Sequence, residues 1–306
     1  MEIAVTSSSF SRKEELKNQL LKYFPVSRFN SEGLKLEGDS LAKFVGNAQG
    51  WILGLEKADA FLLKKCPNLK IISKYGVGLD NIDLEECKKN GVTVGWTSGV
   101  NKLSVAEMIL GFMLALSRNL FQTAFQLKNG IWNKNGGFQL SGKTVGIIGV
   151  GNIGKEVVRL LKPFACSILV NDIVEQKEYY HENNLTETTK EGIFRRSDFV
   201  TIHTPLTSTT RHLVNDSTLK QMKPSAYLIN TARGGIVDQV ALKKALQVRI
   251  IAGAALDVYD MEPPTDEELL RLTNLITTPH IGGNSKEAVM AMGLSAINHL
   301  KMFFSK

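Results

Sequence analysis

The feature that most constrains this chain is a glycine motif near its middle. Residues 145–154 read Val-Gly-Ile-Ile-Gly-Val-Gly-Asn-Ile-Gly, so an apolar strand runs into Gly149-x-Gly151-x-x-Gly154, and a helical pattern follows until Pro163. In such a unit the first glycine permits a tight turn, the second lets a pyrophosphate approach the backbone, and the third lets the helix pack on the strand. The unpaired N–H groups at the start of the helix then bind phosphates, so the sequence predicts a dinucleotide site.

The acidic residue after the next strand selects between dinucleotides. The apolar run over residues 168–171 ends on Asp172. A carboxylate at this place accepts hydrogen bonds from the ribose hydroxyls of the adenosine, and it repels a 2′-phosphate. Ile173 and Val174 follow, where NADP-binding proteins usually carry an arginine. The sequence therefore favours NAD, and Lys177 leaves NADP open as the alternative.

The length of the chain predicts two domains, since 306 residues exceed the size at which one hydrophobic core stops growing. Short apolar runs alternate with helical patterns, which implies parallel sheets joined by right-handed crossovers. Two such sheets fit the length better than one, so the predicted fold class is α/β with two doubly wound parallel-sheet domains. The expected strands cover residues 3–6, 51–54, 70–73, 92–95, 168–172, 199–203, 226–230 and 251–258.

Charge and hydropathy exclude several classes of protein. The lysines and arginines behind the net charge of +7 are scattered along predicted helices, which argues against a nucleic-acid partner but suits attraction of an anion. The first residues read as a strand and not as a secretory signal, and the longest apolar run, residues 108–116, is shorter than the ~20 residues that span a bilayer. We therefore expect no membrane partner and a cytoplasmic protein. Three cysteines without a C-x-x-C pair argue against a disulfide framework and against a metal site.

Two long helical patterns shape the domain organisation. Residues 101–128 read as one helix that is apolar almost all round over residues 108–116, so it is expected to be buried between two lobes or between two subunits. Residues 285–304 form a second, amphipathic pattern, and residues 11–23 form a shorter helix. If the helix at 285–304 packs on the first lobe, the first domain is discontinuous. The expected domains are then residues 1–98 with 285–306, for substrate, and residues 99–284, for the dinucleotide.

Three polar residues downstream of the glycine motif form a candidate reaction centre. Arg233 follows the strand at 226–230, so it reaches the carboxyl edge of a parallel sheet, where ligands bind in open α/β folds. Its guanidinium matches a carboxylate with two parallel hydrogen bonds. His280 and Glu262 each follow a later apolar run. A hydride transfer that converts an alcohol to a ketone must also remove the hydroxyl proton; histidine can accept that proton near neutral pH, and a glutamate can fix the ring tautomer.

His203 is the competitor for the role of base. It lies in Val-Thr-Ile-His-Thr-Pro, whose alternation indicates a half-buried histidine with satisfied hydrogen bonds.

Taken together, these motifs resemble one known family. Their order along the chain is similar to that of the D-isomer-specific 2-hydroxyacid dehydrogenases, and the likeness covers nearly all of the sequence. The stretches that carry it are residues 145–154 with Asp172, residues 203–207, residues 229–238, residues 255–263, residues 278–280, and upstream residues 74–83 and 99–107.

The resemblance implies a Rossmann domain for NAD inserted in a flavodoxin-like substrate domain, with the active site in the cleft between lobes. It implies that Arg233 binds the substrate carboxylate and ketone oxygen, that His280 is the acid/base, that Glu262 is its partner, and that Asp257 holds the nicotinamide carboxamide. Further cofactor contacts are implied at Gly149, Gly151, Asn152, Ile153, Gly154, Asp172, Thr204, Pro205, Thr231, His280 and Gly282. Substrate contacts are implied at the backbone of Tyr75, Gly76, Val77 and Gly78, and at Asn101. It also implies a homodimer joined through the cofactor domain and helix 101–128.

Within the family, residues 74–83 and 101–107 look most like phosphoglycerate dehydrogenase, so 3-phosphoglycerate is the first substrate expectation. Glyoxylate or hydroxypyruvate reduction is the alternative, and an NAD-sensing binding protein of the corepressor kind is a third. Residues 95–98, Gly-Trp-Thr-Ser, replace the more usual Asn-containing segment, so Trp96 is a candidate for altered substrate choice. Lys74 either meets a substrate phosphate or is a solvated lysine at a strand end.

Overall fold

The computed structural model describes residues 1–305, which form two compact units. One unit comprises residues 1–101 together with the C-terminal segment from Gly283 onward, and the other is Lys102–Gly282. The expected domain boundaries, 98/99 and 284/285, lie within three residues of these limits. The chain leaves the first unit once and returns to it, so this unit is discontinuous.

The first unit is built on a sheet of five parallel strands in the order β2-β1-β3-β4-β5. This is the strand order of flavodoxin-like folds. Four of the strands were expected, whereas β2 is an edge strand of mixed polarity whose side chains are only half-buried, so its apolar pattern is weak. The strands are β1 (Glu2–Val5), β2 (Val26–Phe29), β3 (Gly50–Leu53), β4 (Ile71–Lys74) and β5 (Thr93–Gly95).

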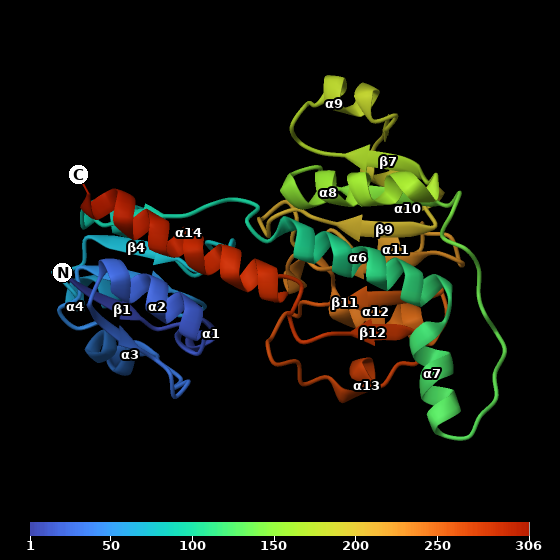
Figure 1. Ribbon diagram of the computed structural model, residues 1–306. Coiled ribbons are helices and arrows are strands. Elements are labelled where there is room, and N and C mark those ends of the chain that lie inside the picture. Colours follow the sequence, from blue (N-terminus) through green and yellow to red (C-terminus); the bar gives the residue numbers. More distant parts are fainter. Residues whose placement is uncertain (306) are drawn as a thin grey trace. The chain divides into compact units, whose positions relative to one another are not determined.

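Helices cover both faces of this sheet because its buried strands carry apolar side chains on both sides. Ile3 and Val5 face one core and Ala4, between them, faces the other, as the period of two in a strand requires. The first core holds α1 (Ser8–Ser11), α2 (Glu14–Tyr23) and α14 (Lys286–Phe304), and the second holds α3 (Gly38–Val45), α4 (Ala60–Lys65) and α5 (Leu84–Lys89). Figure 1 shows α14, the last helix of the chain, lying against the strands of this unit.

The helix expected over residues 11–23 corresponds to α2, which begins three residues later, and the short helix α1 precedes it. Ser7 caps α1 by accepting a hydrogen bond from the Phe10 N–H group. Lys13 is extended, with φ −95° and ψ 104°, so helical geometry resumes only at Glu14.

The second unit is built on seven parallel strands in the order β12-β11-β10-β9-β6-β7-β8. The chain adds strands on one side of β6 and then returns to add β9 on its other side, so the winding reverses between β6 and β9. Ligands bind at such reversal points in open α/β sheets. The strands are β6 (Thr144–Ile148), β7 (Ser167–Asn171), β8 (Thr186–Glu187), β9 (Phe199–Ile202), β10 (Tyr227–Asn230), β11 (Gly253–Leu256) and β12 (Leu275–Thr277).

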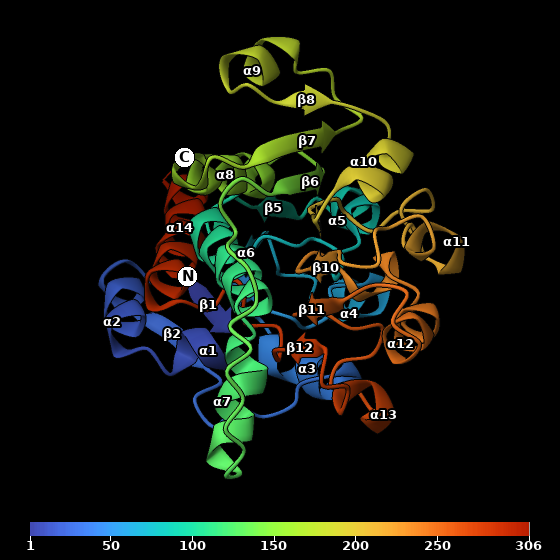
Figure 2. The same cartoon turned by 90° about the vertical axis from the view of Figure 1, so that its right-hand side faces the viewer.

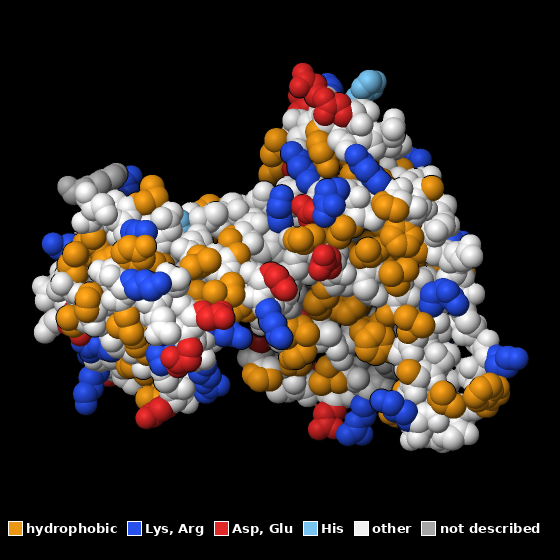
Figure 3. Space-filling view, in the orientation of Figure 1, with side chains coloured by type: hydrophobic (Ala, Val, Ile, Leu, Met, Phe, Trp, Pro, Cys, Tyr) orange, Lys and Arg blue, Asp and Glu red, His pale blue; other side chains and the backbone are white. Residues whose placement is uncertain are grey.

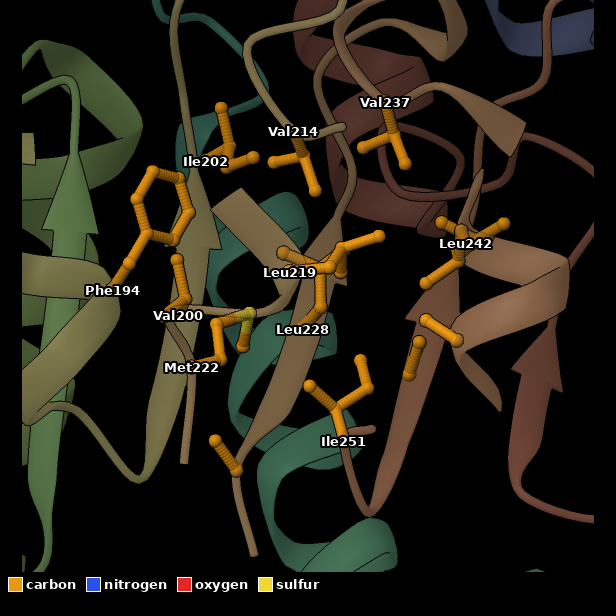
Figure 4. Packing of buried hydrophobic residues seen from close by; sticks show 14 of the residues in the cluster. Phe194, Val200, Ile202, Val214, Leu219, Met222, Leu228, Val237, Leu242 and Ile251 are labelled. Atoms are coloured by element: carbon orange, nitrogen blue, oxygen red, sulfur yellow. The ribbon is translucent and has the colours of Figure 1, made fainter. Parts of the chain in front are cut away.

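Two cores enclose this sheet. In one, Val200 and Leu228 from the strands interleave with Phe194 and Leu242 from the covering helices (Figure 4). The other core lies under the helix that begins at Lys102 and the helix that begins at Asn152, in the glycine motif. The helices are α6 (Lys102–Ser117), α7 (Leu120–Lys128), α8 (Asn152–Leu161), α9 (Lys177–Glu182), α10 (Lys190–Arg196), α11 (Asp216–Leu219), α12 (Gln239–Gln247) and α13 (Glu267–Leu270), with short 3₁₀ turns at Lys162–Phe164 and Gly234–Ile236.

The single helix expected over residues 101–128 is wrong. The structure has α6 and α7, which meet at an angle of 63°. Asn119 between them is left-handed, with φ 52°, a conformation that asparagine tolerates better than most residues. In Figures 1 and 2, α6 lies along the sheet of the second unit and α7 leaves it.

The predicted all-round burial of residues 108–116 does not hold within this chain. Gly111 is exposed, and Met108, Leu110 and Leu114 are half-buried. No single helix of residues 1–305 is long and apolar enough to cross a bilayer; α6 and α7 reach that length and hydropathy only as a bent pair.

Candidate functional site

The glycine turn lies at the point where the winding of the sheet reverses. Gly149 has φ 96°, and a Cβ atom there would stand 2.8 Å from the carbonyl carbon and oxygen of His203 at the end of β9. A Cβ atom on Gly154 would stand 2.3 Å from the Gly149 oxygen, so α8 packs directly on the turn. A Cβ atom on Gly151 would meet nothing within 4 Å. The first and third glycines are therefore required by packing, while the second leaves open the space that a pyrophosphate needs.

Two threonines beside this turn carry hydroxyl groups without partners. Thr204 Oγ1 and Thr231 Oγ1 are buried, and neither has a hydrogen-bond partner within residues 1–305. Thr204 follows β9, the neighbour of β6, and Thr231 follows β10, the next strand along the sheet. Buried polar atoms are normally paired, so these two hydroxyls suit a ligand with its own polar groups. Together with the space at Gly151, they fit a dinucleotide held by the residues that the sequence predicted.

Asp172 is tied to the glycine turn. Its carboxylate accepts hydrogen bonds from the Val150 N–H group at 2.5 Å and from the Val174 N–H group at 2.9 Å. These bonds fix the carboxylate at the end of β7, where an adenosine ribose lies in this fold. Lys177, the residue that left NADP open, pairs with Glu175, and the hydrogen bond that its ammonium donates to Glu175 raises the pKa of Lys177. A 2′-phosphate would therefore have to compete with a neighbouring carboxylate for this cation.

Arg233 is held by the residue that ends β10. Asn230 is fully buried; its Oδ1 accepts from the Ala232 N–H group at 3.1 Å and its Nδ2 donates to the Arg233 oxygen at 2.9 Å. Gly234 follows because any Cβ atom there would lie 2.0 Å from the Tyr259 backbone. The turn therefore presses against the end of the neighbouring strand β11 and brings Arg233 to the edge of the sheet.

His280 and Glu262 are within hydrogen-bond distance of each other at the same edge. His280 Nδ1 lies 2.8 Å from Glu262 Oε2, and Glu262 Oε1 accepts from the Tyr259 N–H group at 3.1 Å. When Nδ1 carries the proton shared with the glutamate, Nε2 is the basic nitrogen of the ring. His280 is also left-handed, with φ 53°. Such strain in a residue other than glycine persists only where its surroundings enforce it.

Asp257 enforces this turn. Its carboxylate is buried and accepts three hydrogen bonds, from the Ile281 N–H group at 2.8 Å, the Gly282 N–H group at 2.7 Å and the Thr278 hydroxyl at 2.6 Å. All three donors belong to the segment that carries His280. The resemblance implied only a cofactor contact for Asp257, and the structure adds this role of holding the turn.

One pocket of about 340 Å³ brings the three predicted catalytic residues together. Arg233, Glu262 and His280 all line it, as do Arg211 and Asp260, which sequence reasoning missed. Arg211 lies in a threonine-rich turn and carries no motif that singles it out. Among the described residues no cluster of histidine, cysteine, aspartate or glutamate is arranged to bind a metal.

The predicted substrate residues Tyr75 to Gly78 and Asn101 lie in the first unit. Tyr75 is buried with its hydroxyl 3.1 Å from Ser9 Oγ, and Gly76 has φ 136°. The N–H groups of Gly76, Val77 and Gly78 donate to no atom of residues 1–305. Asn101 packs against Gly283, where a Cβ atom would stand 2.5 Å from its Nδ2.

Lys74 is not the solvated lysine that sequence reasoning allowed. It is only 5% exposed, and its Nζ donates to the Gly54 oxygen at 2.5 Å and to Asn81 Oδ1 at 2.8 Å. Its ammonium group therefore helps to hold the first unit together.

His203 differs from His280 in its surroundings. Its Nε2 lies 3.1 Å from Thr201 Oγ1, but its Nδ1 is buried and has no partner within residues 1–305, so the expected satisfied histidine is only half satisfied. Burial lowers the pKa of His203 to about 3. The ring stays neutral near pH 7 and cannot cycle through a charged form there, which leaves His280 as the acid/base candidate.

The buried neutral His203 predicts sensitivity of the fold to acid. In the unfolded chain histidine binds a proton near pH 6.5, whereas the folded ring does so only near pH 3, so stability is lost as the pH falls from 6.5. The slope approaches about 1.4 kcal/mol per pH unit. Urea unfolding between pH 7 and pH 4.5 should show a shallower dependence for His203→Gln than for the wild type. His181→Gln, an exposed position on α9, is the control, and equal slopes for wild type and His203→Gln would contradict the prediction.

Comparison with known proteins identifies the family. Residues 110–282 match the model for the NAD binding domain of the D-isomer specific 2-hydroxyacid dehydrogenases. The chain is 37% identical over 271 residues to a hydroxypyruvate reductase of Thermotoga maritima, which covers 87% of this chain and 88% of that protein. It is 40% identical over 244 residues to a D-3-phosphoglycerate dehydrogenase of Methanocaldococcus jannaschii, covering 78% of this chain but 46% of that protein.

Solved structures agree with the sequence comparison. The D-lactate dehydrogenase of Aquifex aeolicus, solved with NAD and lactic acid, superposes with a TM-score of 0.86 at 26% identity and covers all of this chain and 96% of its own. Both parallel sheets and the NAD-binding motif are thus those of known dehydrogenases. The chain belongs to the D-isomer specific 2-hydroxyacid dehydrogenase family, and its cofactor is NAD.

Proposed function

We propose that the protein interconverts a short 2-keto acid and the matching D-2-hydroxyacid, with hydroxypyruvate as the first candidate substrate. The observation that carries the proposal is the pocket in which Arg233, Glu262 and the strained His280 meet at the carboxyl edge of the sheet. The pocket provides a carboxylate receptor and an acid/base pair, which are the groups that this reaction requires.

Each residue has a defined task in this proposal. The Arg233 guanidinium binds the substrate carboxylate with two hydrogen bonds and orients the 2-oxo group. His280 donates the Nε2 proton to the oxygen at C2 during reduction and takes it back during oxidation, while Glu262 stabilises the ring that carries the proton. Bound NADH would supply the hydride for reduction, and bound NAD would accept it in the reverse direction. The residues that would hold the dinucleotide are Gly151, Thr204, Thr231 and Asp172, with Asn152, Ile153, Gly154, Pro205 and Gly282 around them.

Two observations favour a short substrate. The hydroxypyruvate reductase relative matches over nearly its full length, and Lys74 is committed to Gly54 and Asn81. A second candidate is 3-phosphoglycerate, because the phosphoglycerate dehydrogenase relative is 40% identical and Arg211 adds a cation to the pocket that suits a distal phosphate.

Turnover with a panel of acids tests the proposal. With NADH, hydroxypyruvate and glyoxylate should be reduced with a kcat/KM at least about tenfold above that of 3-phosphohydroxypyruvate. The reason is that the phosphate would leave water without gaining a charge contact in the protein, and one such contact is worth a factor of this size. His280→Asn should abolish turnover while NADH still binds, as measured by quenching of protein fluorescence. Preference for the phosphorylated acid would shift the assignment to 3-phosphoglycerate. Absence of turnover by the wild type with every acid would favour the NAD-sensing binding protein instead.

Asp257 gives the proposed mechanism a second test. Asp257→Asn keeps the side-chain volume but presents an NH₂ group to the Ile281 or Gly282 N–H, so the turn that holds His280 must shift. A displacement of this kind costs roughly a hundredfold in kcat. Single-turnover oxidation of NADH measures the hydride step directly. Asp260→Asn removes a carboxylate from the lining of the pocket without touching the turn and is the control; equal losses in the two variants would show that charge and not position matters.

The two units are proposed to divide the work. Lys102–Gly282 corresponds to the predicted cofactor domain, residues 99–284, and the other unit to the predicted substrate domain. In the latter, the N–H groups of Gly76, Val77 and Gly78 are proposed to donate to the substrate carboxylate, with Asn101 as a further contact.

We also propose a homodimer joined through the second unit and α6 and α7. Apolar side chains remain exposed along α7 and the segment after it, and Figure 3 shows hydrophobic side chains gathered over this part of the surface. They are Leu120, Phe121, Phe125, Leu127, Ile131 and Trp132. Patches of this kind mark interfaces.

A charge placed in the patch tests the dimer. Phe125, which is 71% exposed, should become buried on dimerisation, so Phe125→Asp should yield monomers. Size-exclusion chromatography with light scattering measures the mass. Val240→Asp, at a comparably exposed apolar position on α12, should leave the dimer intact, and a wild-type protein of monomer mass would refute the proposal.

A further inference from the structure

We propose that Trp96 is a positioning residue that sets the affinity for substrate by anchoring the turn after β4. The inference rests on the proposed function, in which the N–H groups of that turn bind the substrate carboxylate. Its starting point is a hydrogen bond of 2.7 Å from the Trp96 indole Nε1 to the Val77 oxygen.

The topology of the sheet explains why Trp96 reaches this turn. The strands β4 and β5 are parallel neighbours, with Ser73 opposite Gly95. Lys74 and Trp96 are the next residues, so both strands end at the same edge and Trp96 stands beside the segment that leaves β4. A large indole can span the distance between neighbouring strand ends, which are about 5 Å apart.

The turn is fixed at both of its ends. At Tyr75 the side chain is buried, its ring packs edge-on against Phe10 with centroids 5.6 Å apart, and its hydroxyl lies beside Ser9. At Val77 the carbonyl is held by Trp96. The Val77 carbonyl shares its peptide plane with the Gly78 N–H, so the indole fixes the plane that directs this N–H. The Gly76 N–H shares its plane with the carbonyl of Tyr75, whose side chain is buried.

Trp96 is itself held by the helix that closes the first unit. The next residue, Thr97, has its Oγ1 2.9 Å from His299 Nε2 and accepts a hydrogen bond of 2.8 Å from the Ser295 hydroxyl, both on α14. Gly95 packs on His299 so closely that a Cβ atom would stand 2.6 Å from the histidine Cβ. Trp96 is 39% exposed, so its ring is only partly covered and the hydrogen bond to Val77 helps to determine where it lies.

These contacts hold the binding turn rigid without using a lysine, arginine, aspartate or glutamate side chain. A turn that is already in its binding geometry loses less conformational entropy when the substrate docks. Anchoring by Trp96 should therefore act on substrate affinity, while the acid/base and hydride steps, which use residues of the second unit, stay unchanged.

Trp96→Phe is the test, because it keeps an aromatic ring and removes only the N–H donor. In the full-length enzyme with NADH and hydroxypyruvate, KM should rise about fivefold to tenfold, the effect of one lost hydrogen bond. The kcat and the affinity for NADH should stay within about twofold of the wild type, which a general loss of structure would not allow. Tyr23→Phe, which removes one polar hydrogen from an exposed aromatic side chain of the same unit, is the control and should change neither constant.

Backbone order parameters from 15N relaxation of the ligand-free protein separate this proposal from the assignment of function. The N–H vectors of residues 76–78 should be less ordered in Trp96→Phe than in the wild type, irrespective of any substrate. Unchanged order parameters would show that the indole does not anchor the turn and would overturn the inference even in an active enzyme. Lower order parameters with an unchanged KM would overturn the link to substrate affinity. If the wild type turned over no 2-keto acid, the proposed function would fail and the role in substrate affinity with it, whereas the order parameters would still report on the anchor.

Discussion

The approach of the glycine turn to the end of β9 is the contact on which the second unit depends. The backbone at Gly149 lies so close to the His203 carbonyl that no side chain fits between them. This contact joins the two halves of the sheet at the point where the winding reverses. It also places the glycine turn beside Thr204, so the packing requirement and the ligand site come from the same few atoms.

A second constraint governs the chemistry at the other strand ends. Asn230 is the last residue of β10, and Asp257 directly follows the neighbouring strand β11; both are polar and buried. Asn230 forms hydrogen bonds with the backbone of the loop that follows it, and Asp257 with the backbone of the segment that carries His280. One holds the turn of Arg233 and the other holds the turn of His280. Arg233 and His280, which line the pocket, are thus oriented by Asn230 and Asp257, which do not line it.

Much of this architecture is legible in the sequence because it follows local rules. The apolar runs before Gly149 and Asp172 predict strands, and their spacing predicts a dinucleotide site between them. The family, the two parallel sheets and NAD were all predicted correctly. The grouping of Arg233, Glu262 and His280 in one pocket also follows from their places at parallel strand ends.

The remaining features depend on tertiary contacts that leave no local pattern. The break at Asn119 is a single left-handed residue inside a continuous apolar pattern, so periodicity alone predicts one helix. The edge strand β2 has little apolar character. The role of Asp257 depends on hydrogen-bond donors more than 20 residues away in sequence. Lys74 is held by Gly54 and Asn81, which its local sequence does not indicate. Arg211 enters the pocket from a turn that no motif marks.

The discontinuity of the first unit has a consequence for the order in which the protein is made. The strands β1 to β5 leave the ribosome before the second unit, but the sheet face that carries Ile3, Ile52 and Ile71 is covered in part by α14, which is synthesised after that unit. Lys102–Gly282 is therefore complete, and able to fold, while the earlier unit still lacks a helix. During synthesis the N-terminal sheet must wait with an apolar face exposed, and it is in this interval that the nascent chain most needs protection from aggregation.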